Sequence, residues 1–107
     1  CAIPRPVAGR HGVMDPADVE RALRGGDDLA VAPTRLICVE NTHNDAGGVV
    51  LPVEHLSQLG AVAKRAGIPV HMDGARLFNA SAHLALPISD LCSHVDSVWF
   101  ALCKGLG

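Results

Sequence analysis

Short apolar runs that alternate with helix-forming segments constrain the fold of this chain more than any other feature. The runs predict strands over residues 34–40, 70–73 and 97–102, and helical segments lie before and between them. Alternation of this kind is typical of parallel strands joined by right-handed crossovers. The sequence therefore predicts an α/β fold with mainly parallel strands and crossover helices.

Capping residues and hydrophobic spacing place the helices. Asp15 is the expected N-cap of the first helix, with Pro16 at its first position. In the second helix, apolar residues spaced by three and four form one face, and Gly67 ends it. Residues 1–14 are rich in Pro, Gly and Arg and are expected to be irregular. The expected helices span residues 16–24, 52 or 53 to 66, 75–85 and 88–94.

Composition and charge narrow the classes of protein to which the chain can belong. Hydrophobic residues make up 49% of the 107 residues, but aromatic residues only 3%, which suits tightly packed helix and sheet layers. The net charge is −2 with both signs scattered, so we expect no nucleic-acid partner. No apolar run approaches the roughly 20 residues of a membrane span, and the first residues lack a signal-peptide pattern. We therefore expect a cytoplasmic protein, with the compartment left open.

The four cysteines have no CxxC spacing and are expected to be free and reduced. Cys38 and Cys103 lie in apolar runs, so both are expected to be buried in strands. The spacing of histidines and cysteines matches no structural zinc site, so no metal site is expected. The cysteines are Cys1, Cys38, Cys92 and Cys103.

An acid and a lysine stand at or near the ends of two apolar runs. Asp73 ends the second run and precedes Gly74, and Lys104 follows the third run and precedes Gly105. Cofactors of open α/β sheets sit at such strand ends. The local sequence also fits an Asp73 that caps the following helix and a Lys104 that is an ordinary exposed lysine.

Four motifs around these residues resemble the central segment of the threonine aldolases. That family, which includes the low-specificity L-threonine aldolases, consists of pyridoxal-phosphate (PLP) enzymes with an aspartate-aminotransferase-like fold. The resemblance covers about residues 36–107 and implies that residues 1–107 are part of the PLP-binding large domain. The motifs are Glu40-Asn41-Thr42-His43-Asn44, Gly47-Gly48-Val49-Val50-Leu51-Pro52, His71-Met72-Asp73-Gly74-Ala75-Arg76, and Asp96-Ser97-Val98 with Lys104-Gly105-Leu106-Gly107.

The resemblance implies a role for each candidate residue. Lys104 would hold PLP as a Schiff base, and burial would lower its pKa. Asp73 would keep the ring nitrogen protonated so that the ring accepts electrons. Arg76 would contact the cofactor and substrate region, unless it is a surface arginine. His43 would remove the proton of the substrate's β-hydroxyl directly or through a water, unless it only fixes its loop.

The implied reaction is the cleavage of threonine or allo-threonine, a β-hydroxy amino acid, to glycine and acetaldehyde by a homo-oligomer, a homotetramer in the full-length family. Cys103 departs from the family, which usually has serine before the lysine. The family's phosphate-binding segment and small C-terminal domain are not found in the chain. Alternatives are therefore a catalytically incompetent fragment or pseudoenzyme, or another PLP enzyme of this fold, such as an aminotransferase or hydroxymethyltransferase.

The remaining aromatic and histidine residues are given structural roles. Trp99 and Phe100 are expected in the core. His71 shares a strand face with Asp73 and is expected to support the site indirectly. The other histidines are expected at the surface or in loops: His11, His55, His83 and His94.

Overall fold

A three-stranded parallel sheet with the order β3-β4-β5 forms the centre of the chain in this computed structural model, which describes residues 2–26 and 30–107. The strands are β3 (Ile37–Glu40), β4 (Val70–Asp73) and β5 (Ser97–Trp99). Their register places Glu40, Asp73 and Trp99 side by side in the last row. All three strands therefore end at the same edge of the sheet, as the sequence predicts.

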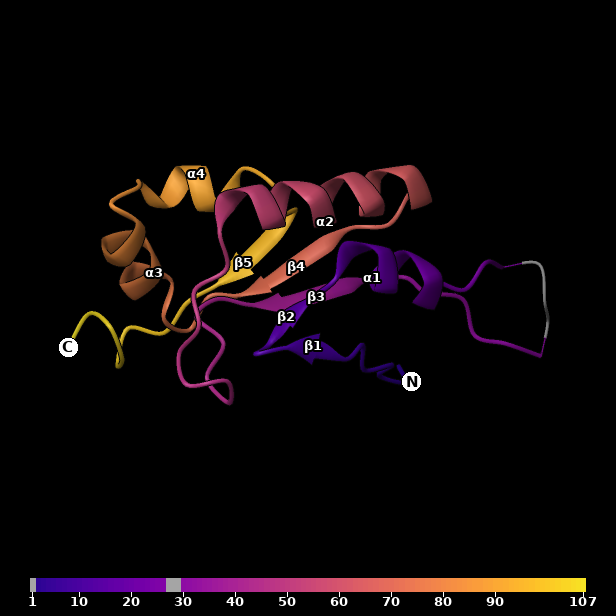
Figure 1. Ribbon diagram of the computed structural model, residues 1–107, viewed down its shortest axis with the longest axis horizontal. Coiled ribbons are helices and arrows are strands. Elements are labelled where there is room, and N and C mark those ends of the chain that lie inside the picture. Colours follow the sequence, from indigo (N-terminus) through magenta and orange to yellow (C-terminus); the bar gives the residue numbers. More distant parts are fainter. Residues whose placement is uncertain (1, 27–29) are drawn as a thin grey trace.

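Four helices alternate with these strands in the described chain. Helix α2 packs on β4, and α1 and α4 both contact α2 (Figure 1). The predicted α/β alternation is confirmed, although several elements are shorter than expected. β3 begins only at residue 37 and β5 ends at residue 99. The helices are α1 (Pro16–Ala22), α2 (Val53–Ala66), α3 (Leu77–Leu84) and α4 (Ile88–Cys92).

The predicted helix boundaries that depend on caps are confirmed. The Asp15 side chain accepts a hydrogen bond from the Ala17 amide at 2.7 Å, which satisfies a backbone donor of the first turn of α1. At the C-terminal end of α2, Gly67 adopts φ 67°, and its backbone amide donates to the carbonyls of Ala63 and Lys64. A left-handed residue of this kind is tolerated best as glycine.

The core lies between the sheet and α2. Alternate strand residues point toward the helix, so Val39 and Met72 are buried there together with Leu56. Because neighbouring residues in a strand face opposite sides, Cys38 points to the other face and is exposed. The prediction that Cys38 is buried was therefore wrong.

The end of the chain also differs from expectation. Cys103 is exposed in a turn beyond β5 rather than buried in a strand, because the strand ends four residues earlier. Trp99 and Phe100 are 45% and 48% exposed. The prediction that both lie in the core was therefore wrong. Phe100 instead packs edge-to-face on Phe78 of α3, with ring centroids 5.5 Å apart. Cys1 lies outside the described residues.

Residues 1–14 are not entirely irregular. Within them, β1 (Gly9–Arg10) and β2 (Val13–Met14) form an antiparallel hairpin. Its two-residue loop, His11-Gly12, has φ values of 52° and 78°, as in the turns that match the twist of paired strands. A His-Gly pair between two short runs is a weak form of a known hairpin signal, and our prediction of irregular chain missed it.

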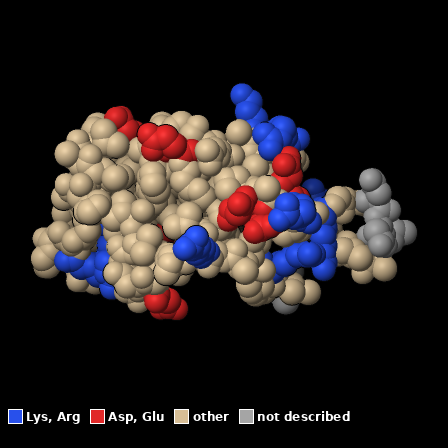
Figure 2. Space-filling view, in the orientation of Figure 1, with Lys and Arg blue, Asp and Glu red and all other residues tan. Residues whose placement is uncertain are grey.

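Charged side chains gather at the end of the molecule opposite the carboxyl ends of the strands. Lys and Arg cluster around α1 and the last turn of α2, with Asp and Glu among them (Figure 2). Arg65 of α2 pairs with Glu20 of α1 at 2.9 Å and so links the two helices at the surface. None of the described helices has the length and hydrophobicity needed to cross a membrane.

Candidate functional site

The residues that the sequence singles out all follow strands that end at one edge of the sheet. Loop 41–48, the start of α3 and residues 100–107 gather at this edge, on the left of Figure 1. Main-chain hydrogen bonds continue the sheet there: the Asn41 amide donates to the Asp73 carbonyl and the Gly74 amide to the Trp99 carbonyl, both at 2.9 Å. This edge is therefore the candidate site.

Asp73 is half-buried at the end of β4. Its Oδ1 accepts a hydrogen bond from the Ala75 amide at 3.0 Å, which fixes the carboxylate over the turn before α3. The N-cap of α3 is Arg76, so Asp73 lies ahead of the helix and is not its cap residue. Among the described residues, nothing donates a hydrogen bond to Oδ2, which leaves this oxygen as an acceptor for an external donor.

Loop 41–48 is fixed by a buried asparagine. The Asn41 side chain is fully buried, accepts from the Leu51 amide at 3.0 Å and donates to the Leu51 carbonyl at 3.3 Å. His43 pairs through its own backbone with Val49 and Gly48. These two hydrogen bonds hold both ends of the loop together. The loop therefore presents His43 from an anchored backbone.

The His43 ring lies beside Glu40. Its Nδ1 accepts a hydrogen bond from the Ala46 amide at 3.3 Å and lies 3.8 Å from Glu40 Oε2. The other oxygen of Glu40 accepts from the Asn44 amide at 3.3 Å. Both side chains are about 30% exposed, so they border solvent while their positions are set by the loop.

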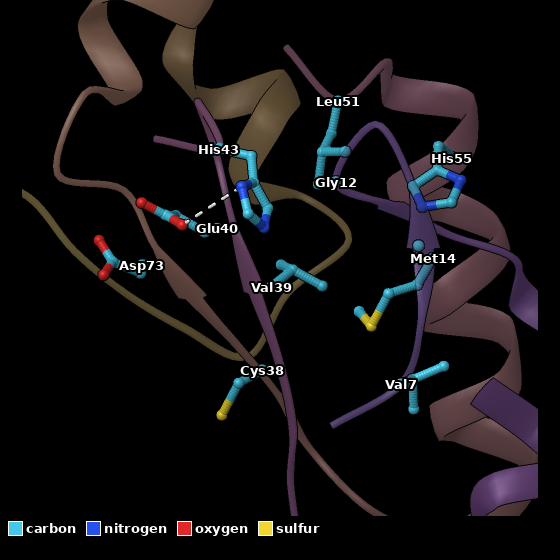
Figure 3. Close-up of a pocket in the computed structure, with 11 residues that line it drawn as sticks. Val7, Gly12, Met14, Cys38, Val39, Glu40, His43, Leu51, His55 and Asp73 are labelled. Carbon is cyan, nitrogen blue, oxygen red and sulfur yellow. Dashed lines mark ion pairs between the residues drawn. The ribbon is translucent and has the colours of Figure 1, made fainter. Parts of the chain in front are cut away.

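A cavity of about 260 Å³ lies between the β1-β2 hairpin and β3 and brings two predicted site residues together (Figure 3). His43 and Asp73 both line it, and Glu40 lies between these two side chains. Ligand pockets usually range from about 300 Å³ upward, so the cavity has the size of a partial site. Its lining consists of Val7, Gly9, Gly12, Met14, Cys38, Val39, Glu40, His43, Leu51, His55 and Asp73.

Arg76 and Lys104 are not among the described residues that line this cavity. Arg76 is half-buried at the start of α3, one turn beyond Asp73. Lys104 is exposed in the turn after β5, rather than desolvated at the end of a longer strand as expected. The neighbouring Gly105 packs against Asn79 of α3 so closely that a Cβ on Gly105 would overlap the Asn79 side chain.

The sequence contains only two lysines, Lys64 and Lys104. Lys64 is exposed in the last turn of α2 and borders a second depression of about 650 Å³ at the opposite end of the sheet. That depression is larger, but among the described residues that line it the only motif residue is Asp96, and none of the candidate site residues Asp73, His43, Arg76 and Lys104 is there. Of the two amines, only Lys104 lies at the edge that carries Asp73 and His43.

Sequence reasoning missed His55, which was expected at the surface. It lies in the first turn of α2 and lines the cavity, and its buried Nε2 has no hydrogen-bond partner among the described residues. Burial lowers the pKa of His55, and the Asp15 carboxylate partly opposes this effect. Its spacing of four and seven residues from Leu59 and Val62, both buried, is the signal that could have placed it on the inner face.

Comparison with known proteins matches the family model described as beta-eliminating lyase over residues 1–107. The chain belongs to the beta-eliminating lyase family. This family member is 48% identical over 97 residues to low-specificity L-threonine aldolase 1 of Arabidopsis thaliana, covering 90% of the chain and 27% of that protein. It is 35% identical over 105 residues to the low specificity L-threonine aldolase of Escherichia coli K12, covering 97% of the chain and 30% of that protein.

Solved structures agree with the fold of this family member. A structure of a candidate L-allo-threonine aldolase from Listeria monocytogenes superposes with a TM-score of 0.78 at 26% identity, over 97% of the chain and 27% of that one. Leishmania major threonine aldolase gives 0.73 at 25% identity, over 84% and 26%. The predicted fold class and the resemblance to threonine aldolases are thus confirmed. The chain spans little more than a quarter of the length of these relatives.

Proposed function

We propose that this chain is part of the PLP-binding large domain of a longer enzyme that cleaves threonine or allo-threonine to glycine and acetaldehyde. The observation that carries the proposal is the edge of the sheet: an acid, a histidine and the only nearby lysine follow three adjacent parallel strands there. Catalytic groups of open α/β sheets gather at this edge. The proposal includes the homo-oligomer of the family.

The described residues fit one side of a bound PLP. The free Oδ2 of Asp73 suits the protonated ring nitrogen, and the exposed amine of Lys104 suits the aldehyde. Arg76, next to Asp73 in the turn, would contact the cofactor's polar groups or the substrate carboxylate. When bound, the cofactor would accept the electrons released as the Cα–Cβ bond breaks.

His43 is the residue of this chain that would meet the substrate's β-hydroxyl. Its ring borders the cavity that Asp73 also lines, and its backbone is held by Val49 and Gly48. An imidazole at this place can form a hydrogen bond with the hydroxyl oxygen during cleavage. The isolated chain is proposed to be catalytically incompetent, because Arg76 and Lys104 do not line the cavity in the described residues.

The test is reductive trapping in the full-length enzyme that carries this chain. Incubation with PLP, reduction with borohydride, proteolysis and mass spectrometry are expected to find the pyridoxyl group on the Lys104 peptide. Lys64 serves as the internal control within the same chain. A label on Lys64, or none in the chain, would refute the assignment of Lys104.

The reaction class is tested by product analysis with the same enzyme. Threonine alone is expected to give glycine and acetaldehyde in equal amounts. Turnover that requires an oxo-acid acceptor would indicate an aminotransferase, and turnover of serine that requires a one-carbon acceptor would indicate a hydroxymethyltransferase. Either result would overturn the proposed activity while leaving the trapping result in place.

A further inference from the structure

Three neighbouring groups fix the His43 ring, and only one of them belongs to its own motif. Glu40 lies on one side, the Ala46 backbone amide points at Nδ1, and Gly12 of the β1-β2 hairpin covers the ring. Gly12 is 31 residues away from His43 in the sequence, so the hairpin brings a distant segment onto the candidate catalytic histidine.

The contact with Ala46 determines which ring nitrogen can carry the hydrogen. The Ala46 N–H donates to Nδ1 at 3.3 Å, and a nitrogen that accepts a hydrogen bond must offer its lone pair. In the neutral ring the hydrogen is therefore on Nε2. Figure 3 shows Nδ1 directed toward Glu40 and the other nitrogen directed away from it, into the space between the hairpin and β3.

Glu40 does not reverse this assignment. Its Oε2 lies 3.8 Å from Nδ1, which is beyond hydrogen-bond distance. Its other oxygen accepts from the Asn44 amide, so the carboxylate holds the loop. A hydrogen on Nδ1 would point at the Ala46 N–H, and the two donors would repel each other.

Gly12 prevents the ring from turning away from this arrangement. A Cβ placed on Gly12 would lie 2.8 Å from His43 Cγ and 2.7 Å from the Ala46 Cβ, closer than such atoms approach in real proteins. Gly12 also has φ 78°, which disfavours any other residue. The backbone of the hairpin therefore packs directly on both the ring and the residue whose amide binds it.

We propose that Gly12 and the Ala46 amide are positioning groups that hold neutral His43 with its hydrogen on Nε2, so that His43 donates a hydrogen bond to the substrate's β-oxygen. This inference rests on the proposed function for the identity of the substrate. It changes the role predicted from sequence: Nε2 in this form has no free lone pair, so His43 stabilises the β-oxygen by hydrogen bonding. The hydroxyl proton then passes to a solvent water and not to His43.

The tautomer can be measured without any turnover. The full-length enzyme, labelled with ¹⁵N-histidine, is examined by solid-state NMR near pH 8, and the His43 signals are identified by their loss in His43→Gln. We expect an unprotonated Nδ1 and a protonated Nε2. A protonated Nδ1 would overturn the proposal, whether or not the enzyme cleaves threonine.

Two substitutions of His43 separate a donor from a base. His43→Gln offers an amide N–H near the position of Nε2, whereas His43→Leu offers no polar group. A donor role predicts that His43→Gln keeps kcat within about tenfold, that His43→Leu loses about 10²–10³-fold, and that the acidic limb of the pH profile is unchanged in His43→Gln. If both variants lose activity equally and the acidic limb disappears, His43 is the base.

Gly12→Ala tests the hairpin's part in positioning, with Gly26→Ala as the matched control, since a Cβ at Gly26 meets no atom of the described residues within 4 Å. We expect kcat of Gly12→Ala to fall about 10- to 100-fold with a smaller change in KM, and the His43 NMR signals to shift, while the absorbance of bound PLP is retained. Unchanged kcat and unchanged His43 signals would refute the positioning role. If wild-type enzyme binds PLP but does not cleave threonine, the proposed function fails, and the NMR signals still decide the tautomer.

Discussion

The parallel sheet and the β1-β2 hairpin border the same cavity, but the sequence predicts the sheet much more clearly than the hairpin. Each strand of the sheet lies in an apolar run, and the last residues of these runs carry the recognisable motifs. Each strand of the hairpin has two residues, and its contribution to the site is a glycine without a side chain. The sheet thus carries the proposed reactive groups, and the hairpin packs on one of them, His43.

The largest effect is expected at the sheet edge, where Lys104→Ala removes the proposed cofactor-binding amine. Aldehyde release by the full-length enzyme should fall by more than about 10⁴-fold, beyond the range of a single acid–base group. Lys64→Ala, in the last turn of α2 and far from this edge, should leave the rate of aldehyde release unchanged. Acetaldehyde production assayed with a coupled dehydrogenase measures both. Retained turnover in Lys104→Ala would mean that the amine at this edge of the sheet is not needed for catalysis.

The next effect concerns the packing that supports the sheet. Leu56 is 1% exposed beneath β3 and β4, so Leu56→Ala should lower the free energy of unfolding by about 2–5 kcal/mol. Glu54→Ala, two residues away on the exposed side of α2, should change it by less than about 0.5 kcal/mol. Urea unfolding followed by circular dichroism gives both values. Equal effects would mean that α2 does not support the sheet as the contacts indicate.

A smaller effect is expected at the junction between the hairpin and α1. Asp15 follows β2 directly and caps α1 through the Ala17 amide, so Asp15→Ala should cost about 1 kcal/mol of stability. Asp15→Asn keeps an accepting oxygen and should cost much less. Thermal unfolding of the two variants compares them. If both variants are equally destabilised, the charge of Asp15 matters more than its cap.

The smallest effect is a pH dependence from His55, which faces the hairpin side of the cavity. Because burial lowers its pKa, the unfolded chain binds a proton more readily than the folded chain as the pH falls below about 6.5. The contribution to stability is therefore complete above that pH and is lost gradually below it. His55→Leu should make unfolding free energies at pH 7.5 and 5.5 more alike, whereas His83→Leu on exposed α3 should not. If the unfolding free energy of His55→Leu changes between pH 7.5 and 5.5 as much as that of the wild type, this prediction is wrong.

The difference between the two regions also explains what the sequence could predict. Val70–Asp73 was located to the residue because an apolar run is bounded by Pro69 and Gly74, and the caps at Asp15 and Gly67 fixed two helix ends. The lengths of β3 and β5 were overestimated, because hydrophobic residues such as Leu36 and Leu102 continue each run although they lie exposed outside the strands.

Within the site, the positions of the candidate residues were easier to predict than the orientation of their side chains. The sequence placed Asp73 and His43 at one edge, and both line the cavity. It could not show that the Ala46 amide binds His43 Nδ1 or that His55 faces the same cavity, because these contacts depend on how the loop and α2 meet the hairpin. Trp99 was misplaced because hydrophobicity does not reveal which face of a strand lacks a covering layer.

The contact between Gly12 and His43 has a consequence for protein engineering. Because the fit depends on a missing side chain, the imidazole can be tilted by altering a turn that contains no reactive group. If the proposed activity holds, libraries aimed at new aldehyde acceptors can vary residues 9–14 and leave Asp73, His43 and Lys104 in place. Changed stereochemical outcome at Cβ would be the product trait to screen, since it responds to small rotations of a hydrogen-bond donor.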